Sequence, residues 1–302
     1  MISRRHAAYG CRHRSRRNFT IDITDDTLYN YVGLYFANKE DFGMLLAVDI
    51  GNSSVKFGLF DNSSENLVAS FSISSLTVRS ADEYALCIKS FLRDRFDESL
   101  PEIDAAVISS VVPHICSVVC KALEQICKNK PFIIGTGTKT GFPIHIDIQS
   151  QLGADIVSNT AAAFAVCKPP FVIVDAGTAT TVTYVDENAA LDGTVIAPGI
   201  ATSLSALVTS AALLPDAPLT KPGALIGKNS RDSVLSGAYF GAVYAIDGFI
   251  RNIREQMRTE SPLGLIGTGG MSSVLADCRN KFTVIPELTL KGAAALYFHN
   301  RQ

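Results

Sequence analysis

The sequence lacks the two compositional features that would link it to nucleic acid or to a membrane. Lys and Arg number 27 against 29 Asp and Glu, which gives a formal net charge of −2. Without a basic excess to neutralise phosphates, nucleic acid is not expected as the main partner. No uninterrupted apolar run reaches the roughly 18 residues of a membrane-spanning helix. The nearest run, residues 160–174, is broken by Lys168, Pro169 and Pro170, so we expect no membrane partner.

Cysteine spacing of a disulfide framework or a zinc site is also missing. The seven cysteines are odd in number, scattered, and contain no C-x-x-C pair, whereas both kinds of site use regularly spaced sets. Cys116 and Cys120 lie four residues apart on one face of a predicted helix, and we expect buried free thiols there. This pattern indicates a reducing cytosol, so we predict a cytoplasmic protein.

What the sequence does contain is enough apolar material for a substantial core. Of its 302 residues, 47% are hydrophobic and 19% are charged, which is typical of a soluble globular protein. The length suits two domains of ordinary size or one large one.

Residues 45–60, LLAVDIGNSSVKFGLF, predict a buried strand, a polar turn and a second strand. The turn begins at Asp49 and contains Gly51, Asn52 and two serines. Such a tip can offer backbone N–H groups and hydroxyls to an anion, while the carboxylate holds a divalent metal beside it. An ordinary β-turn has the same composition, so this segment alone leaves both interpretations open.

A second segment repeats the pattern. Residues 171–184, FVIVDAGTATTVTY, again give an apolar strand, then Asp175, a glycine, hydroxyl residues and an alternating strand. Asp49 and Asp175 therefore occupy equivalent places in two strand–turn–strand units. Two such units facing each other across a cleft could hold the phosphates and metal of a nucleotide from both sides.

The rest of the chain alternates predicted strands and helices. Strands are expected at 67–73, 105–109, 132–134 and 263–266, with 144–148 extended, and helices at 81–95, 114–127, 158–166, 202–213 and 233–254. Residues 193–199, GTVIAPG, predict a turn back towards the cleft. Gly237, Gly241 and Gly248 suggest close helix approach, either within the domain or across a dimer.

Two further motifs lie at the starts of predicted helices. Gly153, Ala154 and Asp155 open the alanine-rich helix. An aspartate in a first turn complements the helix dipole, or it acts as a general base aimed into the cleft. The sequence GTGG at 267–270, between a strand and a predicted helix, would place backbone against adenosine or its phosphates.

Residues 1–43 do not resemble the remainder. Six arginines fall within residues 4–17 with no acid before Asp22, and Met44 directly precedes the first strand. A transit peptide, a basic arm for an anionic surface, and an over-extended gene prediction with the true start at Met44 all fit. We favour the last interpretation.

In this order, the motifs resemble those of the acetate/sugar kinase, Hsp70 and actin superfamily, and more closely the type III pantothenate kinases, over essentially all of residues 44–300. The motifs that carry the resemblance are DIGNSSVKFGLF (49–60), ISSVVP (108–113), LGAD (152–155), VDAGTATTVT (174–183), IAPGI (196–200), IGKNS (226–230), GTGG (267–270) and LTLKG (288–292).

The resemblance implies an α/β fold of duplicated actin-like ATPase (ribonuclease H-like) domains with a nucleotide cleft between them. We place the extension at 1–43, the N-terminal domain at 44–158 and the C-terminal domain at 159–302. The implied activity is ATP-dependent phosphorylation of pantothenate to 4′-phosphopantothenate, the first step of coenzyme A biosynthesis. It would use ATP with Mg²⁺ and a monovalent cation, K⁺ or NH₄⁺, in a homodimer.

The resemblance also implies roles for single residues. Asp155 would be the base that takes the proton from the primary hydroxyl of pantothenate, and Asp175 would bind the monovalent cation. Asp49 would lie near Mg²⁺ through the phosphates. ATP would be bound by Asp49, Ile50, Gly51, Asn52, Ser53, Ser54, Val55, Lys56 and Thr178, and pantothenate by Gly153, Ala154, Asp155, Ile156 and Ser230.

One departure from the family pattern matters. Ile156 stands where the family has an arginine that would pair with the carboxylate of pantothenate, a contact worth about 1.5–3 kcal/mol. Two alternatives therefore stay open beside the kinase: a non-catalytic regulatory relative, and a kinase for another small hydroxyl compound.

Overall fold

The computed structural model describes residues 43–61, 66–96, 101–211, 214, 218–258 and 262–301. The predicted N-terminal extension, apart from Gly43, and with it Cys11, lies outside the described residues.

Two five-stranded sheets share one topology. The first has the order β3-β2-β1-β4-β5 and the second the order β10-β9-β6-β7-β8. In each, an antiparallel three-stranded meander is followed by two strands parallel to its first strand. The repeat confirms the predicted duplicated α/β fold. The strands are β1 Met44–Ile50, β2 Ser54–Asp61, β3 Asn66–Ser74, β4 Ile103–Ser110, β5 Phe132–Ile133, β6 Phe171–Ala176, β7 Ala179–Val185, β8 Leu191–Pro198, β9 Gly264–Thr268 and β10 Thr283–Val284.

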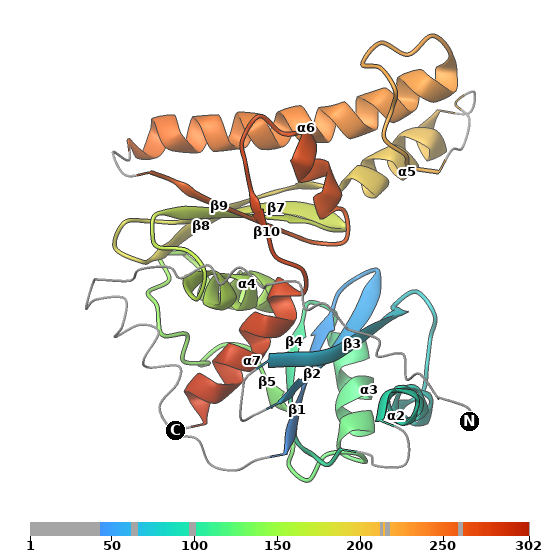
Figure 1. Cartoon of the computed structure of the whole chain (residues 1–302), viewed down its shortest axis with the longest axis vertical. Coiled ribbons are helices and arrows are strands. Elements are labelled where there is room, and N and C mark those ends of the chain that lie inside the picture. Colours follow the sequence, from blue (N-terminus) through green and yellow to red (C-terminus); the bar gives the residue numbers. More distant parts are fainter. Residues whose placement is uncertain are drawn as a thin grey trace, which may run out of the picture.

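The helices form three layers around the two sheets (Figure 1). Helices α4 and α7 lie between the sheets, α2 and α3 cover the outer face of the first sheet, and α5 and α6 cover the outer face of the second. The helices are α2 Ala81–Phe96, α3 Pro113–Leu123, α4 Ala154–Phe164, α5 Ile200–Ser210, α6 Ser230–Met257 and α7 Leu288–Asn300.

Both faces of the two central strands are buried, and this places the predicted aspartates. Leu45 and Ala47 pack into the layer between the sheets, while Leu46 and Val48 pack under α2 and α3. Phe171 and Ile173 face the same middle layer from the second sheet. Because side chains alternate along a strand, Asp49 and Asp175 continue the two inward-facing rows. Both carboxylates therefore project into the space between the sheets.

The middle layer joins the two ends of the chain. Helix α7 packs against α4 and also against β1 and β4 of the first sheet. At Gly292 a side chain would collide with the backbone carbonyl of Ser158 on α4, so only glycine permits this close approach. The division into domains 44–158 and 159–302 stays a prediction, since the last helix of the chain contacts the first sheet.

Two sequence-based expectations were wrong, and a third was confirmed with a different helix type. Residues 193–199 form most of strand β8, paired antiparallel with β7, instead of a turn. As an edge strand, β8 tolerates the glycine and proline that suggested a turn. The helix predicted after the GTGG motif is present as a short 3₁₀ helix, η2 Ser272–Asp277. Cys116 and Cys120 are only partly buried.

Helix α6 is long and apolar enough to cross a membrane by length and composition alone, although 39% of its most apolar window is buried inside the protein. Its buried residues include Tyr239, Val243, Ile246 and Ile250, which pack on the second sheet. A core helix passes the same test, and this packing favours that interpretation.

Candidate active site

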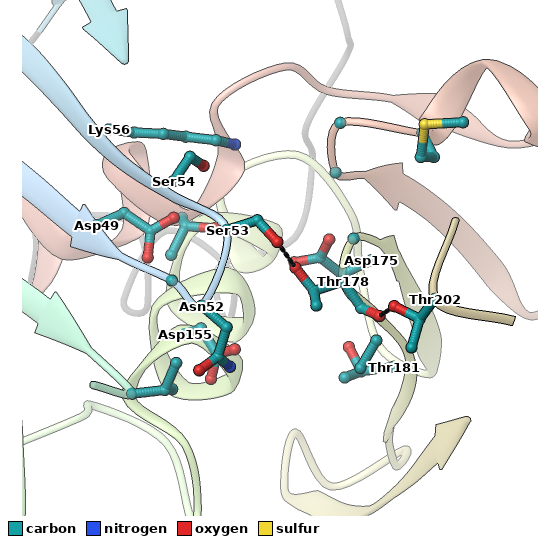
Figure 2. A pocket seen from close by; sticks show the side chains of 18 of the residues that line it. Asp49, Asn52, Ser53, Ser54, Lys56, Asp155, Asp175, Thr178, Thr181 and Thr202 are labelled. Atoms are coloured by element: carbon teal, nitrogen blue, oxygen red, sulfur yellow. Dashed lines mark hydrogen bonds between the residues drawn. The ribbon is translucent and has the colours of Figure 1, made fainter. Parts of the chain in front are cut away.

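A cavity of about 390 Å³ opens at the carboxyl ends of β1 and β6, where the two predicted hairpin tips face each other (Figure 2). Both turns contribute to its lining, together with the first turn of α4, the first turns of α5 and α7, and the GTGG turn after β9. The structure therefore brings together motifs that are up to 240 residues apart in the chain.

The first hairpin tip is held rigidly by the neighbouring strand. The N–H of Gly51 donates to the carbonyl of Ser54 at 3.0 Å, and the Ser75 hydroxyl donates to the carbonyl of Gly51 at 2.7 Å. Gly51, Asn52, Ser53, Ser54 and Lys56 line the cavity. Ile50 and Val55 have fully buried side chains in the core, so they could offer a ligand only backbone groups.

The second tip contacts the first through a hydroxyl pair. Ser53 Oγ and Thr178 Oγ1 are 2.7 Å apart, and the Thr202 hydroxyl donates to the carbonyl of Thr178 at 2.6 Å (Figure 2). Any side chain at Gly199 would collide with the carbonyls of Gly177 and Thr178. The beginning of α5 therefore fixes the turn that carries Thr178.

Three aspartates and one lysine dominate the charge of the cavity. Burial raises the pKa of Asp49 from 3.8 to about 7; Lys56 lowers this pKa, and Asp155, Asp175 and Glu287 raise it further. Lys56 Nζ lies 3.8 Å from Glu287 Oε2, too far for a hydrogen bond. Lys56 thus has a nearby counter-ion but is not fixed by it, and the excess of carboxylates favours a bound cation.

Asp155 has the position expected for the first of the two roles that the sequence left open, and the second, general base, stays a prediction. It lies in the first turn of α4, and its Oδ1 accepts a hydrogen bond of 2.8 Å from the backbone N–H of Ile156. Its side chain also lines the cavity, as does that of Asn52 (Figure 2). Burial raises the pKa of Asp155, and the backbone hydrogen bonds partly oppose this. A carboxylate oriented by the helix and open to the cavity can accept a proton from a bound hydroxyl.

Asp175 is oriented by a hydrogen-bond relay through two helices of the middle layer. Its Oδ2 accepts from Asn159 Nδ2 on α4 at 2.9 Å, and Asn159 Oδ1 accepts from the Thr289 hydroxyl on α7 at 2.9 Å. Burial raises the pKa of Asp175, and the bond from Asn159 lowers it. Gly269, with φ +96°, brings the GTGG turn directly against the Asp175 carboxylate.

A second cavity, of about 430 Å³, lies on the other side of the α4 N-terminus. It shares Val111 with the first cavity and is lined by Gly153 and Ala154, whose neighbour Asp155 faces the first cavity. Ile156 lines neither cavity, because its side chain is buried in the middle layer. Ser230 lies apart from both, in a third cavity of about 550 Å³ at the start of α6.

Sequence reasoning did not identify several residues of the site. Asn159, Glu287 and Thr289 reach it from elements distant in the chain. Ser109 and Thr268 lie in register with Asp49 and Asp175 on the adjacent parallel strands. Both are buried, and the Ser109 hydroxyl has no hydrogen-bond partner among the described residues. The strand ends were predicted, but their pairing was not.

Oxygen ligands suit a hard cation such as Mg²⁺, and the cavity supplies carboxylates and hydroxyls. Among the described residues, no group of three His, Cys, Asp or Glu side chains could hold a metal ion by itself. This is the donor set expected where a cation takes further ligands from phosphates and water. The residues present fit a cation that arrives with a nucleotide.

Comparison with known proteins gives one consistent family. The family model described as type III pantothenate kinase matches residues 45–252. The chain is 33% identical over 260 residues to a type III pantothenate kinase of Exiguobacterium sp. strain AT1b, covering 86% of this chain and all of the relative. It is 36% identical over 259 residues to one of Citrifermentans bemidjiense, covering 85% of this chain and all of the relative.

Among solved structures, a Baf family protein from Campylobacter jejuni, described as a transcriptional activator, superimposes with a TM-score of 0.50 at 20% identity. The match covers 85% of this chain and 98% of that one. It supports the fold alone.

Proposed function

Because this chain belongs to the type III pantothenate kinase family, we propose that it transfers the γ-phosphoryl group of ATP to the primary hydroxyl of pantothenate. The product is 4′-phosphopantothenate, and the reaction is the first step of coenzyme A biosynthesis. The observation that carries the proposal is Asp155, which stands at the boundary between a cavity formed by two polar hairpin tips and a second cavity beside it.

The first cavity holds the nucleotide in this proposal. The tip from Asp49 to Lys56 and the hydroxyl of Thr178 would hold the ATP phosphates, and Asp49 would help to hold Mg²⁺ through them. When bound, Mg²⁺ neutralises charge on the phosphates. Phosphoryl transfer demands mainly positioning and charge neutralisation from the protein. The two hairpins, joined by the hydroxyls of Ser53 and Thr178, supply the positioning. Lys56 contributes to the charge neutralisation.

The second cavity holds the acceptor. Gly153 and Ala154 line it, and Asp155 takes the proton from the attacking hydroxyl as its oxygen bonds to phosphorus. A carboxylate suffices as base because the hydroxyl becomes acidic only as that bond forms. The hydrogen bond from the backbone N–H of Ile156 orients the Asp155 carboxylate, which supports this role.

Asp175 is our candidate for binding a monovalent cation, K⁺ or NH₄⁺, beside the phosphates. Two features support this role: its buried carboxylate has Asn159 as its hydrogen-bond donor, and it lies next to Thr178 (Figure 2). A cation here would offset part of the surplus negative charge of the cavity.

We further propose a cytoplasmic homodimer without a nucleic-acid or membrane partner. Ser230 is exposed at the start of α6 and away from the acceptor cavity of its own chain. Any contact of Ser230 with pantothenate would therefore come from a second copy.

The test is ADP release by the purified full-length protein in potassium buffer, with and without pantothenate. We expect pantothenate-dependent turnover that falls by at least about 10²-fold in Asp155→Asn. Asp94→Asn, the same change on the exposed surface of α2, is the matched control and should leave turnover unchanged. Equal loss in both variants would contradict the role of Asp155.

One observation favours a second candidate, a non-catalytic regulatory relative. Ile156 removes the cation expected for the acceptor carboxylate. Tight nucleotide binding without turnover on pantothenate or on its neutral analogues would support this alternative.

A further inference from the structure

We propose that the acceptor cavity selects an electrically neutral tail, so that the enzyme phosphorylates amide-terminated analogues of pantothenate at least as well as pantothenate itself. This inference rests on the proposed function, because it takes the primary hydroxyl next to Asp155 as the acceptor. It concerns the other end of the substrate, where pantothenate carries its carboxylate.

The first argument is the lining of the second cavity. Among the described residues of one chain that line it, none is Lys, Arg, His, Asp or Glu. Its polar groups are hydroxyls, side-chain amides and backbone from the loop after β5 and from η1 Gln149–Gln151. Neutral amides and hydroxyls pair with such groups one hydrogen bond at a time. A carboxylate would be desolvated there without a counter-ion, which is unfavourable.

The second argument is the place of Ile156. Its side chain is 6% exposed and belongs to the apolar cluster between the sheets, with Ala154, Val157 and Phe164 of the same helix. The position is therefore part of the core in this chain. Isoleucine at this position therefore fits the core of the protein. The side chain at position 156 provides no positive charge to the acceptor cavity.

The third argument is the negative charge of the neighbouring nucleotide cavity. Among the described residues that line the nucleotide cavity, Lys56 is the sole cation beside three aspartates, with Glu287 close to its amine. ATP brings further negative charge. Mg²⁺ and a monovalent cation would offset only part of this negative charge, so an anionic acceptor approaching Asp155 is repelled more strongly than a neutral acceptor of the same shape.

The cavity can also hydrogen-bond a neutral tail. Ser150 and Gln151 line it from η1, and the segment is anchored by the side-chain amide of Gln149, which donates to the carbonyl of Ile144 at 3.2 Å. Their hydroxyl and amide groups can donate to the carbonyl of a terminal amide and accept from its N–H. These two residues are therefore where charge can be introduced to reverse the selection.

The experiment compares kcat/KM of the full-length enzyme for pantothenate and for its primary amide, pantothenamide, with saturating MgATP. We expect the amide to match or exceed pantothenate. At a fixed, saturating K⁺ concentration, the KM for pantothenate should fall as tetramethylammonium chloride is added, because salt screens the repulsion, while the KM for the amide should not change. Gln151→Arg should shift the preference about tenfold towards the carboxylate. Gln125→Arg, the same change at an exposed position that lines neither cavity, is the matched control and should leave the preference unchanged.

The outcomes separate this inference from the proposed function. A preference of about tenfold or more for pantothenate in the unmodified enzyme, or an unchanged preference in Gln151→Arg with turnover retained, would overturn the neutral-tail inference and leave the kinase intact. Phosphorylation of neither compound would overturn the proposed function, and this inference with it. If Gln151→Arg does not fold, Ser150→Arg gives the same test from the neighbouring position.

Discussion

Single residues of the nucleotide cavity are arranged for ligand binding at the expense of stability. Asp49 continues the inward-facing row of an otherwise apolar strand, and burial raises its pKa to about 7. An ionised carboxylate so enclosed is costly until a cation arrives. The sequence pattern alone suggested a phosphate-binding turn, but it could not reveal this conflict.

The conflict predicts that Asp49→Asn stabilises the nucleotide-free protein while it abolishes turnover. The pKa of Asp49 is higher in the folded chain than in the unfolded chain, so the folded state binds more protons between about pH 4 and pH 7. The free energy of unfolding therefore falls as pH rises through about 7. At pH 8 we expect Asp49→Asn to raise it by about 2–4 kcal/mol.

Urea denaturation at pH 5 and pH 8, without nucleotide, measures this effect. The increase in the free energy of unfolding from Asp49→Asn should be smaller at pH 5, because the carboxyl of Asp49 is itself neutral in the folded protein at that pH. Asp94→Asn on the exposed face of α2 should change the stability little at either pH. A variant that is less stable than the wild type at pH 8 would show that Asp49 has a compensating partner.

Among the elements, α7 has the role that sequence analysis most clearly missed. Its motif LTLKG was recognised, but its contacts join residues up to 231 positions apart: Glu287 before its first turn approaches Lys56, and Thr289 bonds to Asn159. The hairpins could be predicted because Asp, Gly and hydroxyl residues follow a short apolar run locally. Strand β8 was missed because an edge strand tolerates turn-forming residues, and the α7 relay because no local pattern encodes it.

The relay predicts a specific consequence for Thr289→Val. The change keeps the shape of the side chain but leaves Asn159 Oδ1 without its donor, so Asn159 is no longer held with its amide towards Asp175. We expect a loss of about 1–2 kcal/mol in the free energy of unfolding. We also expect more K⁺ to be needed for half-maximal turnover, because Asp175 is less well oriented.

The two readouts separate positioning from general destabilisation. Thr283→Val changes the same residue type on exposed strand β10 and should alter neither. Thr289→Ser, which restores a hydroxyl, should recover most of the K⁺ dependence. A Thr289→Val enzyme with lower stability but an unchanged K⁺ dependence would limit the relay to a structural role.

At the scale of the whole molecule, α6 presents two opposite faces. One face, with Tyr239, Val243 and Ile246, is buried on the second sheet. The other carries Gly237, Gly241 and Gly248, around which a side chain would meet nothing within 4 Å of the described chain, and Tyr244, which is 52% exposed. Among the described residues nothing packs closely on these glycines, and packing across a dimer stays a prediction.

If the exposed glycine face of α6 forms the dimer interface, Gly241→Glu should convert the dimer into a monomer. A charged side chain on this face would be buried without a partner against the same face of the second chain, which is unfavourable. Sedimentation equilibrium should therefore give about twice the chain mass for the wild type and a single chain mass for the variant. Gly193→Glu, the same change at another open position on strand β8, should remain dimeric. A monomeric wild type, or two variants that both stay dimeric, would refute this interface. A monomeric but folded Gly241→Glu that also loses pantothenate turnover would show that the acceptor site is completed by the second copy, from the end of α6 where Ser230 lies.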